Sequence, residues 1–228
     1  MKKTKNNSLA LDEEYFSSFK KSKSYKKNQI IIMPGGEPEG IYYLKSGFVR
    51  LYLLSKDGKE LTFNIYKPGS FFPMIWALTK TPNIYFFESL TRAQVLIAPK
   101  DAIVERIQEN PQLLYTLTIR TLKGLDGLTR LMDALLSNKN AYHKVASILT
   151  MLIMRFGKRT KNKAVITIPL THRVIGSLAG LSREATSREL ERLTKEKIIY
   201  QNNHRITIKN IKKLEEESLI TFTANIIY

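Results

Sequence analysis

Short apolar runs separated by turn residues dominate the first half of this 228-residue chain. Between Tyr25 and Pro99, Gly, Pro, Asp and Asn interrupt the apolar runs at close intervals, which is typical of strands joined by tight turns. Asp57-Gly58 lies between two such runs and predicts a hairpin. The expected strands cover residues 30–33, 40–44, 48–54, 61–66 and 93–98. Many short strands joined by turns predict an antiparallel barrel or roll, of the double-stranded β-helix or jelly-roll type.

The pattern changes to a long helix at Asn110 and Pro111, because Asn caps helices well and Pro suits the first helical turn. Apolar and small residues then recur at alternating spacings of three and four over about three heptads, as in a coiled-coil seam. The seam residues are Leu114, Thr118, Thr121, Leu125, Leu128, Met132 and Leu135. We therefore predict a dimerisation helix over residues 111–137; the alternative is a single buried helix. Leu117, Leu122 and Leu131 widen the apolar face and are expected to pack on the roll.

Residues 171–193 predict two short helices around a tight turn, the geometry that places a helix in the DNA major groove. Thr171 and Ser182 are the expected N-caps. Gly180 lies where the turn needs a positive φ, and Leu181 is expected to be buried in the turn. Arg183, Glu184, Ser187 and Arg188 then lie on the outward face of the second helix.

Arginine on such a face can bind O6 and N7 of guanine, and glutamate can accept from N4 of cytosine. The alternative is an ordinary helical hairpin on the protein surface. Around the motif, we expect a helix up to Phe156, a basic loop over 158–163, a strand over 164–168 and a small hairpin over 198–208 with its turn at Asn202-Asn203. These elements predict a winged helix-turn-helix, followed by a helical tail over 211–219.

The charge balance favours an anionic partner. The chain holds 37 Lys and Arg against 20 Asp and Glu, a formal charge of +17. Nucleic acid is the first candidate and an acidic membrane surface the second. About +10 of this charge lies from Asn138 onward, where phosphate contacts would be made.

Other chemistries find little support. The absence of cysteine excludes disulfides, thiolate zinc sites and iron–sulfur clusters ligated by cysteine. The only histidines are His143, His172 and His204, and none lies in the predicted roll, which argues against a metalloenzyme on this architecture. The chain has no P-loop, Gly-x-Ser-x-Gly or Rossmann pattern. We expect no catalytic residues, no metal and no cofactor. No stretch has the length of a membrane span and no secretory signal is evident, so we expect a cytoplasmic protein.

Roll, long helix, hinge at 137–140 and winged helix-turn-helix, in this order, resemble the Crp/Fnr family of bacterial transcription regulators over about residues 12–210. The strongest match runs from Ile175-Gly176 through Gly180 to Ser182-Arg183-Glu184 and Arg188. Gly40 to Arg50, Pro68 to Phe71 and Ala98-Pro-Lys100 are similar to turns and strands of the family's roll. One departure is Thr186, where the family usually has an apolar residue; its methyl group can still face inward.

The resemblance implies base contacts by Arg183, Glu184 and Arg188. It places Ser182 and Ser187 on phosphate. With the remaining residues near the reading helix and the wing, the expected phosphate contacts are Thr171, His172, Ser182, Ser187, Lys195, Asn203 and Arg205.

The effector site of the family is not retained. Members that bind cyclic nucleotides hold the ribose with a Gly-Glu pair and the phosphate with an Arg followed by Ser or Thr. The aligned positions here are Pro73-Met74 and Ile84-Tyr85. A phosphate there would lose its charge-assisted bonds and keep its desolvation cost, so we predict no binding of cyclic AMP.

Aromatic and apolar residues gather in sequence around the lost site. The candidate effector pocket consists of Phe72, Met74, Trp76, Ile84 and Tyr85. They could form a sensor for an apolar small molecule, or simply fill the roll, which we favour because such residues are ordinary in strands.

The sequence thus predicts an α+β protein: a β-roll over 1–110, a dimerisation helix over 111–137 and a winged helix-turn-helix domain over 138–228. We expect a homodimeric regulator, not an enzyme, that binds double-stranded DNA at a palindromic operator and contacts RNA polymerase if it is an activator. The alternatives are a family member that needs no effector, or an apolar-ligand-binding roll whose basic domain docks on another anionic partner.

Overall fold

The structure is a computed structural model that describes residues 11–136 and 140–220. Contacts divide the chain into two compact units, Met1–Leu53 with Asn64–Ile119, and Leu54–Phe63 with Arg120–Tyr228. Of the hinge expected at 137–140, only Asn140 lies within the described residues, where its side chain caps the following helix.

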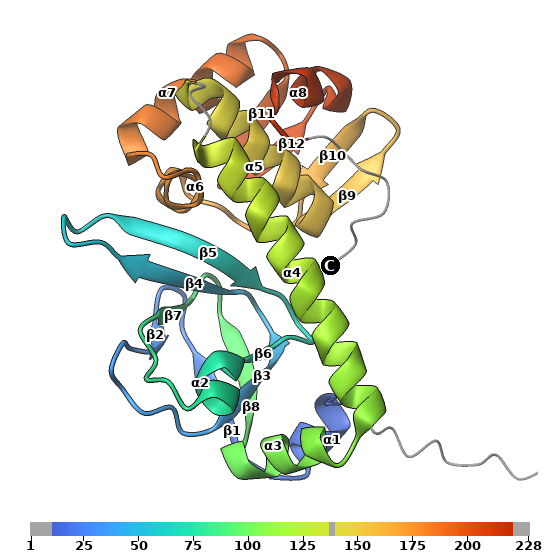
Figure 1. Ribbon diagram of the computed structural model, residues 1–228. Helices are drawn as coiled ribbons and strands as arrows, with labels where there is room; N and C mark the ends of the chain where they lie inside the picture. The colour runs from blue at the N-terminus through green and yellow to red at the C-terminus, as the bar shows by residue number, and fades with distance from the viewer. Residues whose placement is uncertain (1–10, 137–139, 221–228) are drawn as a thin grey trace, which may run out of the picture. The chain divides into compact units, whose positions relative to one another are not determined.

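The predicted roll is present as two four-stranded sheets (Figure 1). One sheet has the order β1 (Ser22–Tyr25), β8 (Ala93–Ala98), β3 (Ile41–Ser46) and β6 (Phe71–Phe72). The other has the order β2 (Ile30–Ile32), β7 (Phe86–Ser89), β4 (Val49–Leu54) and β5 (Glu60–Tyr66). The pairings β1–β8, β3–β8 and β4–β7 are antiparallel. The hairpin predicted at Asp57-Gly58 joins β4 to β5, and Gly58 has φ +76°.

A column of stacked aromatic rings joins the two sheets. Phe72 of β6 stacks on Tyr42 of β3, with ring centres 5.7 Å apart, and on Phe87 of β7 at 5.0 Å. Tyr66 of β5 stacks on both Phe72 and Phe87. Offset stacking adds to the hydrophobic gain of burying such rings, so aromatic residues occupy much of the roll's interior.

Three short helices accompany the sheets. The predicted lead helix is α1 (Glu13–Ser17), which Asp12 caps. The sequence did not predict α2 (Met74–Thr79) or α3 (Lys100–Gln108). Buried Phe16, Ile103 and Ile107 from α1 and α3 join Ile41 and Phe71 in one hydrophobic cluster.

The long helix α4 spans Pro111–Leu136, close to the expected range. The predicted cap is confirmed, because the Asn110 side chain accepts from the Leu113 backbone amide at 3.1 Å. Leu117 packs against the core cluster of the roll and Leu131 is buried. Leu122, which we expected to pack, is 55% exposed. The apolar face turned toward the core is therefore narrower than predicted.

The second unit contains the winged helix-turn-helix. Its helices are α5 (Ala141–Phe156), α6 (His172–Ala179), α7 (Arg183–Lys195) and α8 (Ile211–Glu217). Its sheet has the order β11 (Ile199–Asn202), β12 (Arg205–Ile208), β10 (Lys163–Ile166) and β9 (Gly157–Thr160). Leu149, Leu152, Ile175, Leu190 and Leu193 form much of its buried interior. The expected loop over 158–163 was wrong, because these residues belong largely to the β9–β10 hairpin.

Among the described residues, no helix has the length and apolar character needed to cross a membrane.

Candidate functional site

The two-helix motif forms as its caps predict. The Thr171 hydroxyl accepts from the Val174 amide at 3.3 Å and begins α6. The Ser182 hydroxyl accepts from the Ala185 amide at 3.1 Å and begins α7. Gly180 has φ +64°, the left-handed conformation expected for the turn. Local hydrogen bonds therefore set where each helix starts, and Gly180 sets where α6 ends.

The contact between α6 and α7 depends on a small residue facing a polar one. Thr186 is completely buried, and its hydroxyl donates to the Ser182 carbonyl at 2.8 Å. A Cβ on Gly176 would lie only 2.8 Å from that hydroxyl oxygen. Leu181, expected to be buried, is only half-buried, and Thr186 instead lies between the helices. The hydroxyl that made Thr186 unusual is thus satisfied within its own helix.

The three predicted base-reading residues are presented together on α7. Arg183, Glu184 and Arg188 are exposed within its first two turns. Within residues 11–136 and 140–220, their side chains form no hydrogen bond or ion pair. Glu184 and Arg188 are four residues apart and share one helix face, and Arg183 precedes Glu184 in the first turn, so one ligand surface at the start of α7 can reach all three.

The predicted phosphate contacts divide into two groups. Lys195, Asn203 and Arg205 are exposed on α7 and the wing. Thr171 and Ser182 use their hydroxyls for capping. His172 and Ser187 bond each other, with the His172 Nδ1 and Ser187 Oγ atoms 2.7 Å apart. A phosphate contact by either of these two would compete with that bond.

Three side chains connect the end of α7 to α5. The Tyr142 hydroxyl donates to Glu196 Oε2, and Arg192 Nε donates to Glu196 Oε1 at 3.0 Å. The Arg192 guanidinium also lies 4.0 Å from the centre of the Tyr142 ring. The hydrogen bonds from Tyr142 and Arg192 hold the pKa of Glu196 below its ordinary value. Burial, together with the bond to Glu196, raises the pKa of Tyr142.

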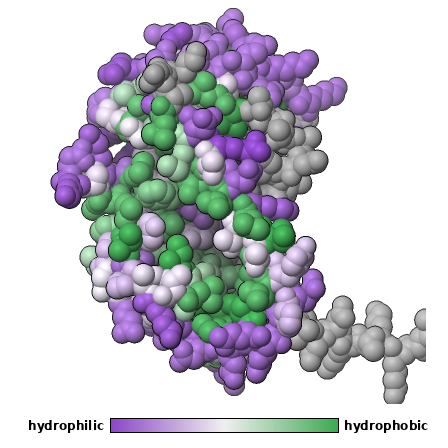
Figure 2. Space-filling model, in the orientation of Figure 1, coloured by the Kyte–Doolittle hydropathy of each residue, from purple (hydrophilic) through white to green (hydrophobic). Residues whose placement is uncertain are grey.

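Surface hydropathy distinguishes α7 from α4. In Figure 2 the surface over α7 and neighbouring elements is mostly hydrophilic, whereas hydrophobic surface occurs along α4. Of the predicted seam residues, Leu114, Leu125 and Met132 are 50%, 58% and 49% exposed. Thr118 and Thr121 are also exposed, and Leu128 and Leu135 are half-buried. An apolar stripe that the chain itself leaves uncovered is what a helix-to-helix interface requires.

The candidate effector residues do not surround one large cavity. Met74, Trp76 and Tyr85 line a cavity of about 30 Å³, roughly the volume one water occupies in the liquid. Phe72 is fully buried in the aromatic column, and Ile84 is 56% exposed and lines neither cavity found around α2. The structure therefore brings three of the five residues together around a space too small for an organic effector.

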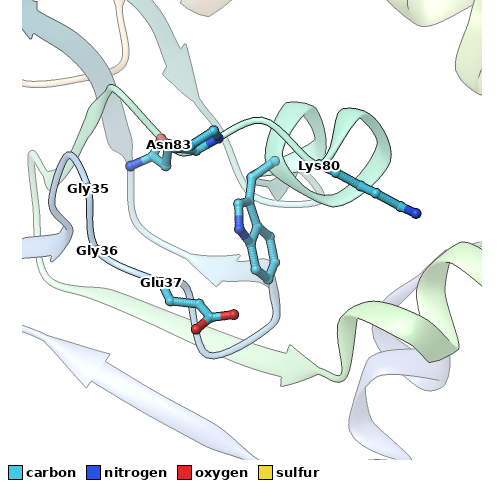
Figure 3. A pocket seen from close by; sticks show the side chains of 7 residues that line it. Gly35, Gly36, Glu37, Lys80 and Asn83 are labelled. Atoms are coloured by element: carbon cyan, nitrogen blue, oxygen red, sulfur yellow. The ribbon is translucent and has the colours of Figure 1, made fainter.

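A larger depression of about 230 Å³ lies beside Trp76 at the surface. Figure 3 shows its lining, with Glu37 from the segment after β2 and Asn83 from the segment after α2. The Asn83 amide is fully used, because it donates to the carbonyls of Met33 and Tyr85 and accepts from the Tyr85 amide. Lys100 lies 4.6 Å from the centre of the Trp76 ring. Of the polar side chains that line this depression, Asn83 is therefore occupied by the backbone around it.

Sequence reasoning missed a buried ion pair in the roll. Arg50 of β4 and Glu88 of β7 are directly opposed, and Arg50 Nη2 donates to Glu88 Oε2 at 2.6 Å. Arg50 is fully buried and Glu88 is 4% exposed. A charged residue inside each of two apolar strands was the available signal. Among the described residues, no group of three or more metal-ligating side chains is assembled.

Comparison with known proteins agrees with this architecture. Residues 22–110 match the cyclic nucleotide-binding domain, and residues 143–217 match the Crp-like helix-turn-helix domain. The chain is similar to a global nitrogen regulator of Nostoc sp., with 27% identity over 81% of this chain and 83% of that protein. It is also similar to the anaerobic regulatory protein of Haemophilus influenzae, with 26% identity over 86% and 76% of the two chains.

Solved structures give the same result. A transcriptional regulator of the CRP/FNR family from Thermus thermophilus has 25% identity and a TM-score of 0.66, covering 86% of this chain and 97% of that one. FixK2 from Bradyrhizobium japonicum shares the fold with a TM-score of 0.73 and 24% identity, over 87% and 96% of the two chains. The two domains and these relatives define a DNA-binding transcription regulator rather than an enzyme. The chain belongs to the Crp/Fnr family.

Proposed function

We propose that this regulator works as a homodimer that reads a palindromic operator through Arg183, Glu184 and Arg188. The observation that carries the proposal is the set of three exposed, unpartnered side chains at the start of α7. A helix with such a first turn suits the major groove, where arginine selects guanine and glutamate selects cytosine. The exposed stripe of α4 supports the dimer, and two-fold protein symmetry imposes two-fold symmetry on the site.

Each of three parts of the chain would have its own role in DNA binding. We propose a roll over 1–110, a dimerisation helix over 111–137 and a DNA-binding domain over 138–228. Lys195, Asn203 and Arg205 would contact backbone phosphate and position the reading helix. A protein with this activity acts on the chromosome, so we propose a cytoplasmic location and, if it activates transcription, a contact with RNA polymerase.

We further propose that cyclic AMP is not the effector. Pro73, Met74, Ile84 and Tyr85 supply no charge for a sugar phosphate. The roll does bury an arginine and a carboxylate, but Arg50 and Glu88 bond each other. Isothermal titration calorimetry with cyclic AMP should give no binding heat. A micromolar dissociation constant would contradict this proposal.

The small cavity beneath Trp76 supports a roll filled by its own side chains, and hence a regulator that needs no internal effector. Soaking crystals with xenon or fragments tests this, because a filled roll admits nothing. Electron density for a fragment among Met74, Trp76 and Tyr85 would favour the alternative, a sensor for an apolar ligand.

The decisive experiment is selection of bound duplexes from a random DNA library, with purified protein and no added ligand. Enrichment of a two-fold symmetric motif, with half-sites about one helical turn apart, is the expected result. Binding without enrichment would contradict effector-independent reading and would favour the alternative of docking on another polyanion. Repeating the selection at several salt concentrations separates base reading from phosphate attraction.

A further inference from the structure

His172 connects the three elements of the proposed DNA-binding surface. It is the first residue of α6 and is half-buried. Its Nδ1 atom lies 2.7 Å from the hydroxyl of Ser187 on α7, and its Nε2 atom lies 3.0 Å from Oε1 of Gln201 on β11. Both ring nitrogens are therefore used, one toward the reading helix and one toward the wing.

The chain of hydrogen bonds has only one consistent direction. The Thr194 hydroxyl donates to the Leu190 carbonyl at 2.8 Å, and a carbonyl can only accept. The Thr194 oxygen must then accept from the Gln201 amide nitrogen, which lies 3.2 Å away. The same nitrogen lies 3.4 Å from the Leu190 carbonyl, which requires the same amide orientation. The Gln201 oxygen consequently faces His172.

This direction selects one tautomer of a neutral His172 ring, and with it the role of Ser187. Because Gln201 Oε1 can only accept, His172 Nε2 carries the ring proton, and a neutral ring then leaves Nδ1 as an acceptor. Ser187 donates its only hydroxyl hydrogen to that acceptor. Toward a ligand on the surface of α7, the Ser187 oxygen offers lone pairs and no hydrogen.

Phosphate oxygens also only accept, so a Ser187 oxygen without a free hydrogen does not fit phosphate. The donors in the major groove are the amino groups, N6 of adenine and N4 of cytosine. Ser187 lies one turn beyond Arg183 and Glu184 on the same helix face, so it is placed where base edges would be read.

We propose that His172 is a positioning residue that fixes Ser187 as a hydrogen-bond acceptor, so that Ser187 selects a base with an amino group. The inference rests on the proposed DNA reading and deepens it. It replaces the phosphate contacts expected for His172 and Ser187 with a specificity role for both.

The tautomer can be measured without DNA. Two-dimensional ¹⁵N spectra of the full chain at pH 8 resolve the ring nitrogens of its three histidines, and His172→Ala identifies the His172 signals. The expected result is a protonated Nε2 and an unprotonated, hydrogen-bonded Nδ1. A proton on Nδ1 would overturn the proposal.

The reading role is tested with every single-base variant of the selected operator. In the wild type, one base-pair position should prefer an amino-bearing base by about three- to tenfold, the contribution of one hydrogen bond. Ser187→Ala should lose that preference by weakening binding to the preferred base. His172→Ala should lose it differently, by gaining affinity for the carbonyl-bearing base, because a free hydroxyl can rotate to donate.

A third variant should reverse the direction of the hydrogen bond between His172 and Ser187. Gln201→Glu places a carboxylate against Nε2, which favours a doubly protonated ring that donates to Ser187; the preferred base should then change from an amino-bearing to a carbonyl-bearing one. Preferences unchanged in both His172→Ala and Gln201→Glu would overturn the positioning role.

Two further outcomes separate this inference from the proposed function. If a symmetric motif is selected but Ser187→Ala weakens every sequence equally, Ser187 contacts phosphate and the inference alone fails. If the wild type selects no motif at all, the proposed base reading fails and the inference fails with it.

Discussion

Arg188 and Lys195 lie two turns apart along α7, and both are exposed, yet we expect different roles for them. Arg188 is near the helix start, where base edges are reached, whereas Lys195 is in the last turn. Arg188→Ala should cost about 1–3 kcal/mol of binding and relax specificity at one base-pair position. Lys195→Ala should weaken all sequences about equally and reduce the salt dependence.

Competition binding with the single-base variants of the operator measures both effects. Each variant is the control for the other, because both remove one positive charge from the same helix. A uniform loss of affinity in both would show that Arg188 contacts phosphate rather than a base.

Gly176 and Gly180 are both needed in the two-helix motif, for different reasons. A Cβ at Gly176 would lie 2.9 Å from the Leu181 carbonyl as well as close to Thr186, so Gly176→Ala should destabilise the motif by about 1–3 kcal/mol. Gly180 has open space around its Cβ position but a positive φ. Asparagine tolerates that conformation, so Gly180→Asn should cost less than Gly176→Ala.

Hydrogen exchange of the α6 and α7 amides measures both changes in the second unit alone. Equal protection in the two variants would contradict the packing explanation for Gly176.

At the scale of elements, the attachment of α7 to α5 should make the stability of the second unit depend on pH. The pKa of Glu196 is lowered, so its contribution is present above the unfolded value of about 4.3 and is lost as the pH falls through the folded value. The pKa of Tyr142 is raised, so its contribution is complete below about pH 10 and is lost as the pH rises through the folded value.

Tyr142→Phe should therefore cost about 1 kcal/mol at neutral pH, the net worth of one hydrogen bond, and weaken the alkaline dependence. Glu196→Gln should reduce the loss of stability that the second unit shows as the pH falls. Urea unfolding followed by circular dichroism from pH 3 to 11 measures both slopes. If the free energy of unfolding falls in parallel for the wild type and Glu196→Gln as the pH is lowered, other carboxyl groups cause the acid dependence.

The pairing of β4 with β7 depends on its buried ion pair. Glu88→Ala leaves Arg50 charged and buried, which should cost about 3–5 kcal/mol, whereas Arg50→Met with Glu88→Leu should come close to the wild type or exceed its stability. Trp76 is the only tryptophan and lies in the first unit, so its fluorescence follows the roll during denaturation. If the double variant were as unstable as Glu88→Ala, shape rather than charge would dominate this pair.

Elements with strong local signals were predicted well. The caps Asn110, Thr171 and Ser182 gave the starts of three helices within the described residues. The helix α2 was missed because its six residues are almost all apolar and show no helical period. The helix α3 was missed although Ile103 and Ile107 at a spacing of four were a usable signal. The β9–β10 hairpin was misread because its residues are mostly exposed and basic, as in a loop.

The candidate site shows where sequence stops being informative. Exposure of Arg183, Glu184 and Arg188 follows from helical periodicity alone. The bonds of His172 to Ser187 and Gln201 join residues 15 and 29 positions away, so they depend on how α6, α7 and β11 pack. Likewise, the pairing of Arg50 with Glu88 depends on strand register.

For the whole molecule, the decisive question is whether α4 pairs with a second copy. Leu125 is 58% exposed at the centre of the predicted seam. In a dimer, Leu125→Glu would bury a carboxylate at that seam and remove apolar burial worth about 1.5–3 kcal/mol per leucine. Sedimentation equilibrium should therefore show dissociation to monomers at concentrations where the wild type is dimeric.

DNA binding should change in parallel. Two linked reading helices gain about 10²–10⁴ in affinity over one, so Leu125→Glu should lose at least about a hundredfold on the palindrome while keeping the same half-site preference. Thr116→Glu adds the same charge to α4 away from the predicted seam and should change neither property. A wild type that is monomeric, or a Leu125→Glu variant that remains dimeric, would mean that α4 is not the dimer seam, and the two-fold operator would then need another source of symmetry.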